Sequence, residues 1–156
     1  MTSMSAPADP PALPRDALAC VLDLLIPASA DGRLPSAGEL ALAAYVEELA
    51  ATTPGLRPLL AQGLSKLDAE AADHGARGFA ALAPDARRAL FDELVKSLPA
   101  FAPTVFFVAM TGYYREPRVL AALGLEARPP FPKGHAVGET DFGLLERVRQ
   151  RGKLYR

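Results

Sequence analysis

The amino-acid sequence predicts an all-α protein, a compact helical bundle of about five main helices with an extended Pro/Gly-rich C-terminal tail. Apolar residues recur at helical spacing, as at Leu18, Val21, Leu22 and Leu25, which places them on one face of a helix. No segment shows the sustained apolar–polar alternation or the Asn-Gly turn that indicates a β-hairpin. Prolines and glycines separate the helical stretches, so each predicted helix has a defined beginning and end.

The first helix begins near Pro14, because proline is tolerated in a first turn, and it ends at Pro27, which cannot continue it. A loop containing Asp31-Gly32 then leads to a second helix at about residues 36–51. This second helix is expected to be amphipathic. Its predicted inward face consists of Leu40, Ala44 and Tyr45.

Four more helical segments follow. Residues 56–74 are predicted to form a third helix with a leucine-rich inner face, and Pro84-Asp85 opens a fourth. The fifth, at residues 101–114, is apolar nearly all round, which is typical of a central helix buried on most sides. Pro117 fits the first turn of a short sixth helix, and Gly124 is expected to supply its left-handed C-terminal cap.

The chain is therefore predicted to have three parts: a flexible N-terminal arm at residues 1–13, a helical domain at 14–124, and a C-terminal tail at 125–156. The tail contains one short amphipathic helix among Pro- and Gly-rich segments. It offers too little apolar surface to offset the entropy lost on ordering it. We therefore expect the tail to lie along the body of the protein or along a partner.

Composition and charge exclude several classes of protein. The formal net charge of -1 gives no bulk attraction to nucleic acid or to anionic lipid. A single cysteine, Cys20, excludes an internal disulfide, and its apolar helical context favours a buried thiol. No apolar run approaches the ~20 residues of a transmembrane helix. The N-terminal arm shows no export signal, so a soluble cytoplasmic protein is expected.

The sequence also shows no pattern typical of a cofactor, metal or nucleophile site. His74 and His135 lie far apart and have no ligand-like neighbours at helical spacing. Neither a G-x-S-x-G elbow nor a glycine-rich phosphate loop occurs. We therefore expect no catalytic residue, no metal and no cofactor in this chain.

The C-terminal end is basic, but it does not resemble a nucleic-acid site. Glu146 interrupts the positive charge, and no aromatic residues are interleaved to stack on bases. An acidic protein surface, or simply water, is the better match. The basic residues are Arg147, Arg149, Arg151, Lys153 and Arg156.

Two adjacent tyrosines, Tyr113 and Tyr114, end the apolar fifth helix in the stretch TGYYREPRVLAALG. Neighbouring residues of a helix point about 100° apart, so one ring can be buried while the other faces out. Both could cap the core with hydroxyls at a wet edge. Alternatively, at least one forms a contact surface with the Pro-lined segment RPPFPKGH. The candidate partner-contact residues are then Tyr113, Tyr114, Arg115, Phe131, Pro132, His135 and Tyr155.

Three stretches, taken in order, resemble a known family. They are LLIPASADGRLPSAGELALAAYVEELA, LSKLDAEAADHGARGFAAL and FFVAMTGYYREPRVLAALG. The order is similar to that of the gluconate 2-dehydrogenase subunit 3 family and covers most of residues 16–124. The best markers are the loop from Ile26-Pro27 to Gly32, and Gly112-Tyr113-Tyr114 followed by Pro117.

The resemblance implies a non-catalytic small subunit. It would pair with a large FAD-dependent subunit of the glucose-methanol-choline oxidoreductase type, which oxidises a sugar or alcohol, and a cytochrome often accepts the electrons. Many small subunits of this family carry a twin-arginine export signal, and this sequence shows none. The complex would then be cytoplasmic, or periplasmic if the partner carries the signal; a removed leader is disfavoured by the initial Met.

A second hypothesis belongs to a different class of protein. The chain could be a free-standing helical enzyme or small-ligand-binding protein that uses Tyr113, Tyr114 and His135 around a pocket. Such a protein should be stable alone and gain stability from its ligand. An accessory subunit should instead depend on its partner or show a protease-sensitive tail.

Overall fold

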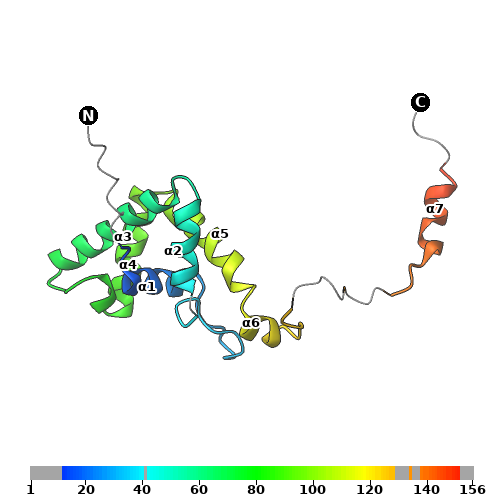
Figure 1. The fold of residues 1–156 in the computed structure, drawn as a ribbon, viewed down its shortest axis with the longest axis horizontal. Coiled ribbons are helices and arrows are strands. Elements are labelled where there is room, and N and C mark those ends of the chain that lie inside the picture. The colour runs from blue at the N-terminus through cyan, green and yellow to red at the C-terminus, as the bar shows by residue number, and fades with distance from the viewer. Residues whose placement is uncertain (1–11, 41, 129–133, 135–137, 152–156) are drawn as a thin grey trace, which may run out of the picture.

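The computed structural model describes residues 12–40, 42–128, 134 and 138–151. This part of the chain contains helices and no β-strand, which confirms the all-α prediction (Figure 1). Six α-helices form the body: α1 Arg15–Leu25, α2 Leu42–Thr52, α3 Leu56–Asp73, α4 Pro84–Ser97, α5 Phe101–Tyr113 and α6 Pro117–Ala122. A 3-10 turn, η1 (Phe79–Ala81), lies between α3 and α4, and the tail contains η2 (Phe142–Leu145) followed by α7 (Glu146–Arg149).

The core forms where α1, α2 and α3 pack against α5. Their leucines and valines interdigitate around the aromatic rings of Phe79 and Phe101, both fully buried. The core extends to Leu13, one residue before the predicted start of the helical domain. Apolar burial at this scale is the main favourable term in folding, so this four-helix contact region supports the rest of the chain.

Two glycines allow the helices to approach closely. A Cβ added at Gly63 of α3 would overlap the ring of Phe101, and one at Gly112 of α5 would lie 2.6 Å from the Cδ1 atom of Tyr45. Gly112 therefore serves packing between α2 and α5. This requirement explains the glycine of the Gly-Tyr-Tyr stretch in physical terms.

The second helix begins at Leu42, and not at residue 36 as predicted. Residues 36–40 form a turn instead, and the amide of Gly38 donates to the carboxylate of Asp23 on α1 at 2.8 Å. Of the residues predicted to face inward, Leu40 is buried and Tyr45 packs partly buried against the core, whereas Ala44 is exposed. The buried positions of α2 itself are Leu42, Val46 and Ala50.

The connection between α1 and α2 is long, yet well ordered by hydrogen bonds. The amide of Ser29 donates to the carbonyl of Leu34 at 3.0 Å, and the amide of Leu34 donates back to the Ser29 hydroxyl at 2.8 Å. Between them, Asp31 accepts bonds from the Ser29 hydroxyl and the Arg33 amide. Gly32 supplies the left-handed backbone of this tight turn, with φ of 70°.

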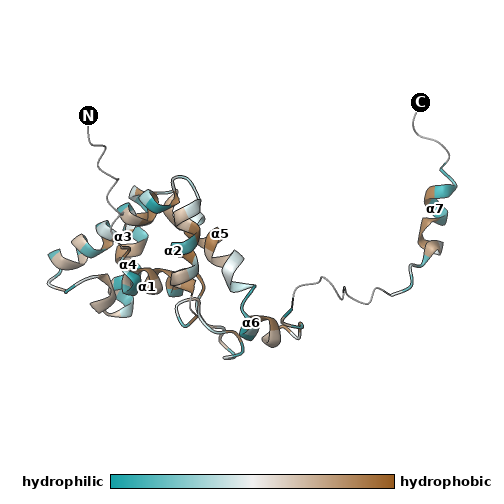
Figure 2. Cartoon of the chain, viewed as in Figure 1, coloured by the Kyte–Doolittle hydropathy of each residue, from teal (hydrophilic) through white to brown (hydrophobic). Residues whose placement is uncertain are grey.

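Helix α5 packs against α1, α2 and α3, as predicted for a central helix, but it is not buried on most sides, which corrects that part of the prediction. One face, including Val105 and Ala109, packs into the core. The opposite side carries Phe106 and Phe107, which are 40% and 71% exposed. Figure 2 shows the hydrophobic character of α5. The reason is geometric: α1, α2 and α3 pack on one part of α5, and the part that carries Phe107 borders an open groove.

None of the described helices is by itself long and apolar enough to cross a membrane. Only α4 and α5 taken together reach the required length and composition, and they meet at a bend of 112°.

The final turn of the body matches the prediction. Pro117 opens α6, and Gly124 follows it with φ of 73°. The amide of Leu125 donates to the carbonyl of Leu120 at 2.8 Å, which closes the C-terminal cap. Beyond this point, every described residue from 138 to 151 is exposed, and Figure 1 shows η2 and α7 apart from the body.

Candidate partner-binding surfaces

The side chains of Tyr113 and Tyr114 separate at the end of α5. Tyr113 is buried, with 3% of its surface exposed, and its hydroxyl donates to the backbone carbonyl of Pro35 at 2.7 Å. Tyr114 is 50% exposed and meets the Tyr113 ring edge-on, with centroids 5.5 Å apart. The structure therefore assigns Tyr113 to the core. Tyr114 is the tyrosine whose ring a partner can reach, and such contact stays a prediction.

Burial raises the pKa of Tyr113, and the nearby Tyr114 and Glu39 raise it further. The folded protein thus favours the neutral phenol. A raised folded pKa contributes stability that is complete below the unfolded value of about 10 and is lost as the pH rises through the folded value. The hydroxyl of Tyr113 is therefore part of the structure and not a poised base.

Substituting Tyr113 with phenylalanine is expected to lower the free energy of unfolding by about 1 kcal/mol, because the Pro35 carbonyl loses its donor. The variant should also lose part of the decline in stability above about pH 10. Thermal melts across neutral and alkaline pH measure both effects. The other tyrosines are the same in the variant and the wild type, so their contributions cancel in the comparison. Parallel pH profiles for variant and wild type would contradict the assignment.

Arg115 lies over the ring of Tyr45, with its guanidinium carbon 5.6 Å from the ring centroid. The Tyr45 hydroxyl also lies 3.1 Å from the Thr111 hydroxyl. These contacts hold Arg115 across the junction of α2 and α5 while its side chain stays open to solvent. Arg115 is therefore positioned at the same end of the body as Tyr114.

A hollow of about 520 Å³ lies beside Tyr114 and the end of α6. It combines apolar side chains with the charges of the following segment. Its lining consists of Tyr114, Arg115, Leu120, Gly124, Leu125, Glu126 and Arg128. The remaining predicted contact residues, Phe131, Pro132, His135 and Tyr155, lie outside the described residues, so their contribution stays a prediction.

An apolar groove on the body was missed by sequence reasoning. It has a volume of about 440 Å³ and lies between the end of α2, the start of α3 and the exposed side of α5. Its lining is Leu49, Thr53, Pro54, Gly55, Leu56, Leu59, Thr104, Phe107 and Val108. The sequence did contain a signal for this groove, namely the all-round apolar character of α5. A helix of this kind can have one apolar side that binds a partner instead of packing in the core. We call this surface the α5 groove.

The tail presents a second apolar surface. Phe142, Leu144, Leu145 and Val148 are between 45% and 76% exposed. The carboxylate of Asp141 accepts from the Gly143 amide at 2.9 Å and so caps the start of η2. Hydrophobic residues recur along η2 and α7 in Figure 2.

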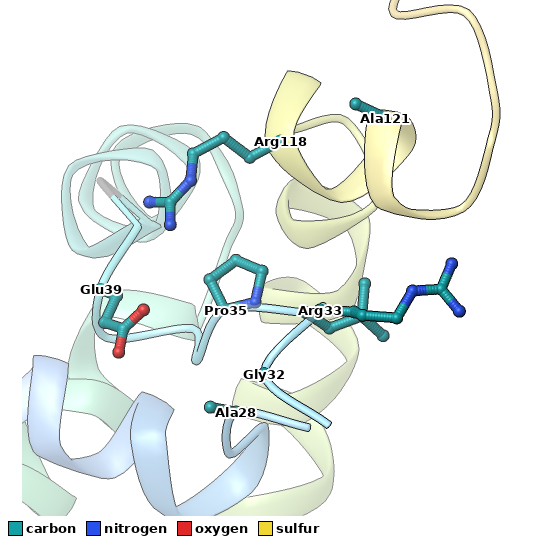
Figure 3. Close-up of a pocket in the computed structure, with 8 residues that line it drawn as sticks. Ala28, Gly32, Arg33, Pro35, Glu39, Arg118 and Ala121 are labelled. Carbon is teal, nitrogen blue, oxygen red and sulfur yellow. The ribbon is translucent and has the colours of Figure 1, made fainter. Parts of the chain in front are cut away.

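A third surface lies where the loop between α1 and α2 meets α6. This hollow, of about 460 Å³, is lined by Ala28, Gly32, Arg33, Leu34, Pro35, Glu39, Arg118 and Ala121. Figure 3 shows the Arg118 side chain reaching from α6 to the side of Pro35 on which Glu39 lies, while Arg33 extends to the other side. We call it the loop–α6 hollow. It joins the first and the third of the three stretches that carried the family resemblance.

The described residues contain no group of three or more His, Cys, Asp or Glu side chains that could hold a metal ion. Cys20 is half-buried, and its sulfur accepts from the Arg87 guanidinium at 2.9 Å. The most developed surfaces of this part of the chain are thus apolar grooves and hollows, which suit recognition of another molecule.

Comparison with known proteins identifies the family. The family model described as gluconate 2-dehydrogenase subunit 3 matches residues 14–123, which is nearly the whole helical body. Neither a curated protein nor a solved structure matches the chain. The match confirms the resemblance derived from the sequence, and the family name denotes a subunit of a dehydrogenase complex. The chain belongs to the gluconate 2-dehydrogenase subunit 3 family.

Proposed function

We propose that this chain is a non-catalytic accessory subunit that binds and stabilises a large FAD-dependent sugar or alcohol dehydrogenase of the glucose-methanol-choline type. Membership of a dehydrogenase-subunit family supports this proposal. FAD and substrate would then belong to the large subunit, and a cytochrome is a candidate electron acceptor. The complex is cytoplasmic in this proposal, or periplasmic if the large subunit carries an export signal.

The observation that carries the proposal is the α5 groove. Phe107 is 71% exposed although it belongs to a helix that forms the core of the protein. Exposed apolar side chains gathered around a groove are a common feature of protein interaction sites. Aromatic side chains in apolar grooves are also the residues that supply most of the energy of protein interfaces. We therefore assign the α5 groove to the partner.

The exposed apolar residues and the positive charge of the tail also support an accessory function. Its apolar residues are exposed, and Arg147, Arg149 and Arg151 give its last helical turns positive charge. A segment that folds against a partner loses entropy at that moment, but it covers a large surface. The tail from 128 to 156 would then wrap over the large subunit, with its basic end on acidic surface.

Stabilisation of the large subunit follows from binding alone. A subunit present at about 1,000 times its dissociation constant stabilises its folded partner by about 4 kcal/mol. Apolar burial contributes about 25 cal/mol per Å² before the entropy of association is subtracted. No catalytic residue in the small subunit is needed for this effect.

The alternative function, a free-standing enzyme or ligand-binding protein, required Tyr113, Tyr114 and His135 around one pocket. Tyr113 instead lies in the core with its hydroxyl on Pro35. The hollow beside Tyr114 does not include Tyr113 in its lining, and His135 is outside the described residues. The accessory function is therefore better supported.

Expression of the large subunit with and without this chain tests the proposal. We expect the large subunit expressed alone to have a lower soluble yield, a lower flavin content and a lower melting temperature. Flavin absorbance, dye-linked dehydrogenase activity and co-purification measure the difference. A large subunit that is equally soluble, flavin-loaded and active without this chain would contradict the accessory function.

A further inference from the structure

The loop–α6 hollow has the rigidity of a preformed binding site. The Tyr113 hydroxyl holds the Pro35 carbonyl from below at 2.7 Å, and the Arg33 guanidinium donates to the carbonyl of Ala122 at 2.7 Å. The loop is thereby attached both to α5 and to α6. Connections of this length without helix or strand are uncommon in compact domains and are often functional. Rigid walls lower the entropy lost when a ligand binds.

Two opposite charges stand unpaired across this hollow. Arg118 on α6 and Glu39 on the loop both line the hollow and are both exposed, and Figure 3 shows them on the same side of Pro35. Within the described part of the chain, neither side chain makes a hydrogen bond or ion pair. Arg33, by contrast, is committed to Ala122. The hollow therefore presents one free donor group and one free acceptor group above an apolar floor.

We propose that the loop–α6 hollow binds an extended peptide segment of the large subunit. This inference rests on the proposed accessory function and specifies part of its interface. A peptide group has a carbonyl and an N–H on opposite sides, which match the donor at Arg118 and the acceptor at Glu39. Leu34 and Pro35 then receive a small apolar side chain of the segment.

Two other occupants are alternatives to a peptide segment of the large subunit. In a symmetric dimer the hollow would have to receive a protruding part of the same interface patch from the second copy, and the crosslinking experiment below distinguishes that occupant from the large subunit. Small molecules are usually enclosed over most of their surface, whereas Glu39 and Arg118 form an exposed rim. A peptide that crosses the rim suits this shape, and the hollow adjoins α6, which also borders the Tyr114 surface.

Binding of the purified large subunit to Arg118→Gln and Glu39→Gln variants tests the proposal. Arg88→Gln and Glu48→Gln are matched controls, because both residues are exposed and neither lines the hollow. Each hollow variant is expected to raise the dissociation constant about tenfold, as for loss of a charge-assisted hydrogen bond. The controls should stay within about twofold. All four positions are exposed, so melting temperatures should match wild type.

A photo-crosslinking residue, benzoylphenylalanine, in place of Ala28 identifies the occupant directly. Crosslinks to one short contiguous segment of the large subunit would support the proposal. Crosslinks only to a second copy of this chain, or unchanged affinity of both hollow variants, would overturn it while the accessory function stands. Equal losses in hollow and control variants would overturn it as well. Failure of the wild-type chain to bind the large subunit would overturn both.

Discussion

Substitution of Gly63 by alanine is expected to lower the free energy of unfolding by about 2 kcal/mol, although alanine is the better helix former. The reason is steric: a Cβ at this position of α3 overlaps the buried ring of Phe101. Phe101 lies in the tightly packed core, where a displaced ring has no free space to enter. Urea or thermal unfolding of the full chain measures the change, which corresponds to a fall of roughly 4–8 °C in Tm.

A control variant and a second background test whether the loss of stability comes from the contact with Phe101. Gly138→Ala is the matched control, because a Cβ there meets no atom within 4 Å and its φ is not positive. A Phe101→Leu background should reduce the cost of Gly63→Ala, because the smaller side chain leaves room for the methyl group. If Gly63→Ala is as stable as Gly138→Ala, the close packing of α3 on Phe101 is wrong.

Substitution of Phe107 by aspartate is expected to weaken binding of the large subunit by about 2–4 kcal/mol, the effect of losing an aromatic hot spot and adding an unpaired charge. The ring is 71% exposed in the free subunit and borders the α5 groove. The variant should fold normally, because little buried surface is lost. Calorimetric titration against the large subunit measures the affinity, and a thermal melt of the small subunit checks its fold.

Ala86→Asp on α4 is the control for the added charge, since Ala86 is exposed and does not line the groove. It should bind the large subunit within about 0.5 kcal/mol of wild type. If Phe107→Asp binds as tightly as Ala86→Asp, the α5 groove is not the docking surface. The tail and the Tyr114 surface would then be the remaining candidates.

Most helix boundaries could be predicted from the glycine and proline residues beside them. Helices α3, α4 and α5 begin where glycine or proline residues predicted, and Gly124 caps α6. The start of α2 could not be predicted in this way, because the Asp23 carboxylate on α1 holds residues 36–40 in a turn. A contact between distant segments outweighed the helical preference of that stretch. Leu40, predicted to lie within the helix, is instead buried in the turn that precedes it.

The candidate surfaces were predicted only in part. The sequence identified Tyr113, Tyr114 and Arg115 as residues of interest, and helix geometry required the two tyrosine rings to diverge. Which ring enters the core depends on Pro35, a residue 78 positions away that accepts the bond from Tyr113. The α5 groove was missed because an all-round apolar helix does not reveal how many neighbours cover it.

By itself, the sequence determined the all-α class, the order of the helices and the family, because these depend on spacing and on local turn chemistry. Tertiary structure decided which apolar side of α5 stays open and which tyrosine is exposed. It also placed Glu39 and Arg118 in the lining of one hollow, the loop–α6 hollow. Each of these outcomes depends on packing between segments far apart in the chain, and periodicity along the chain carries no information about such packing.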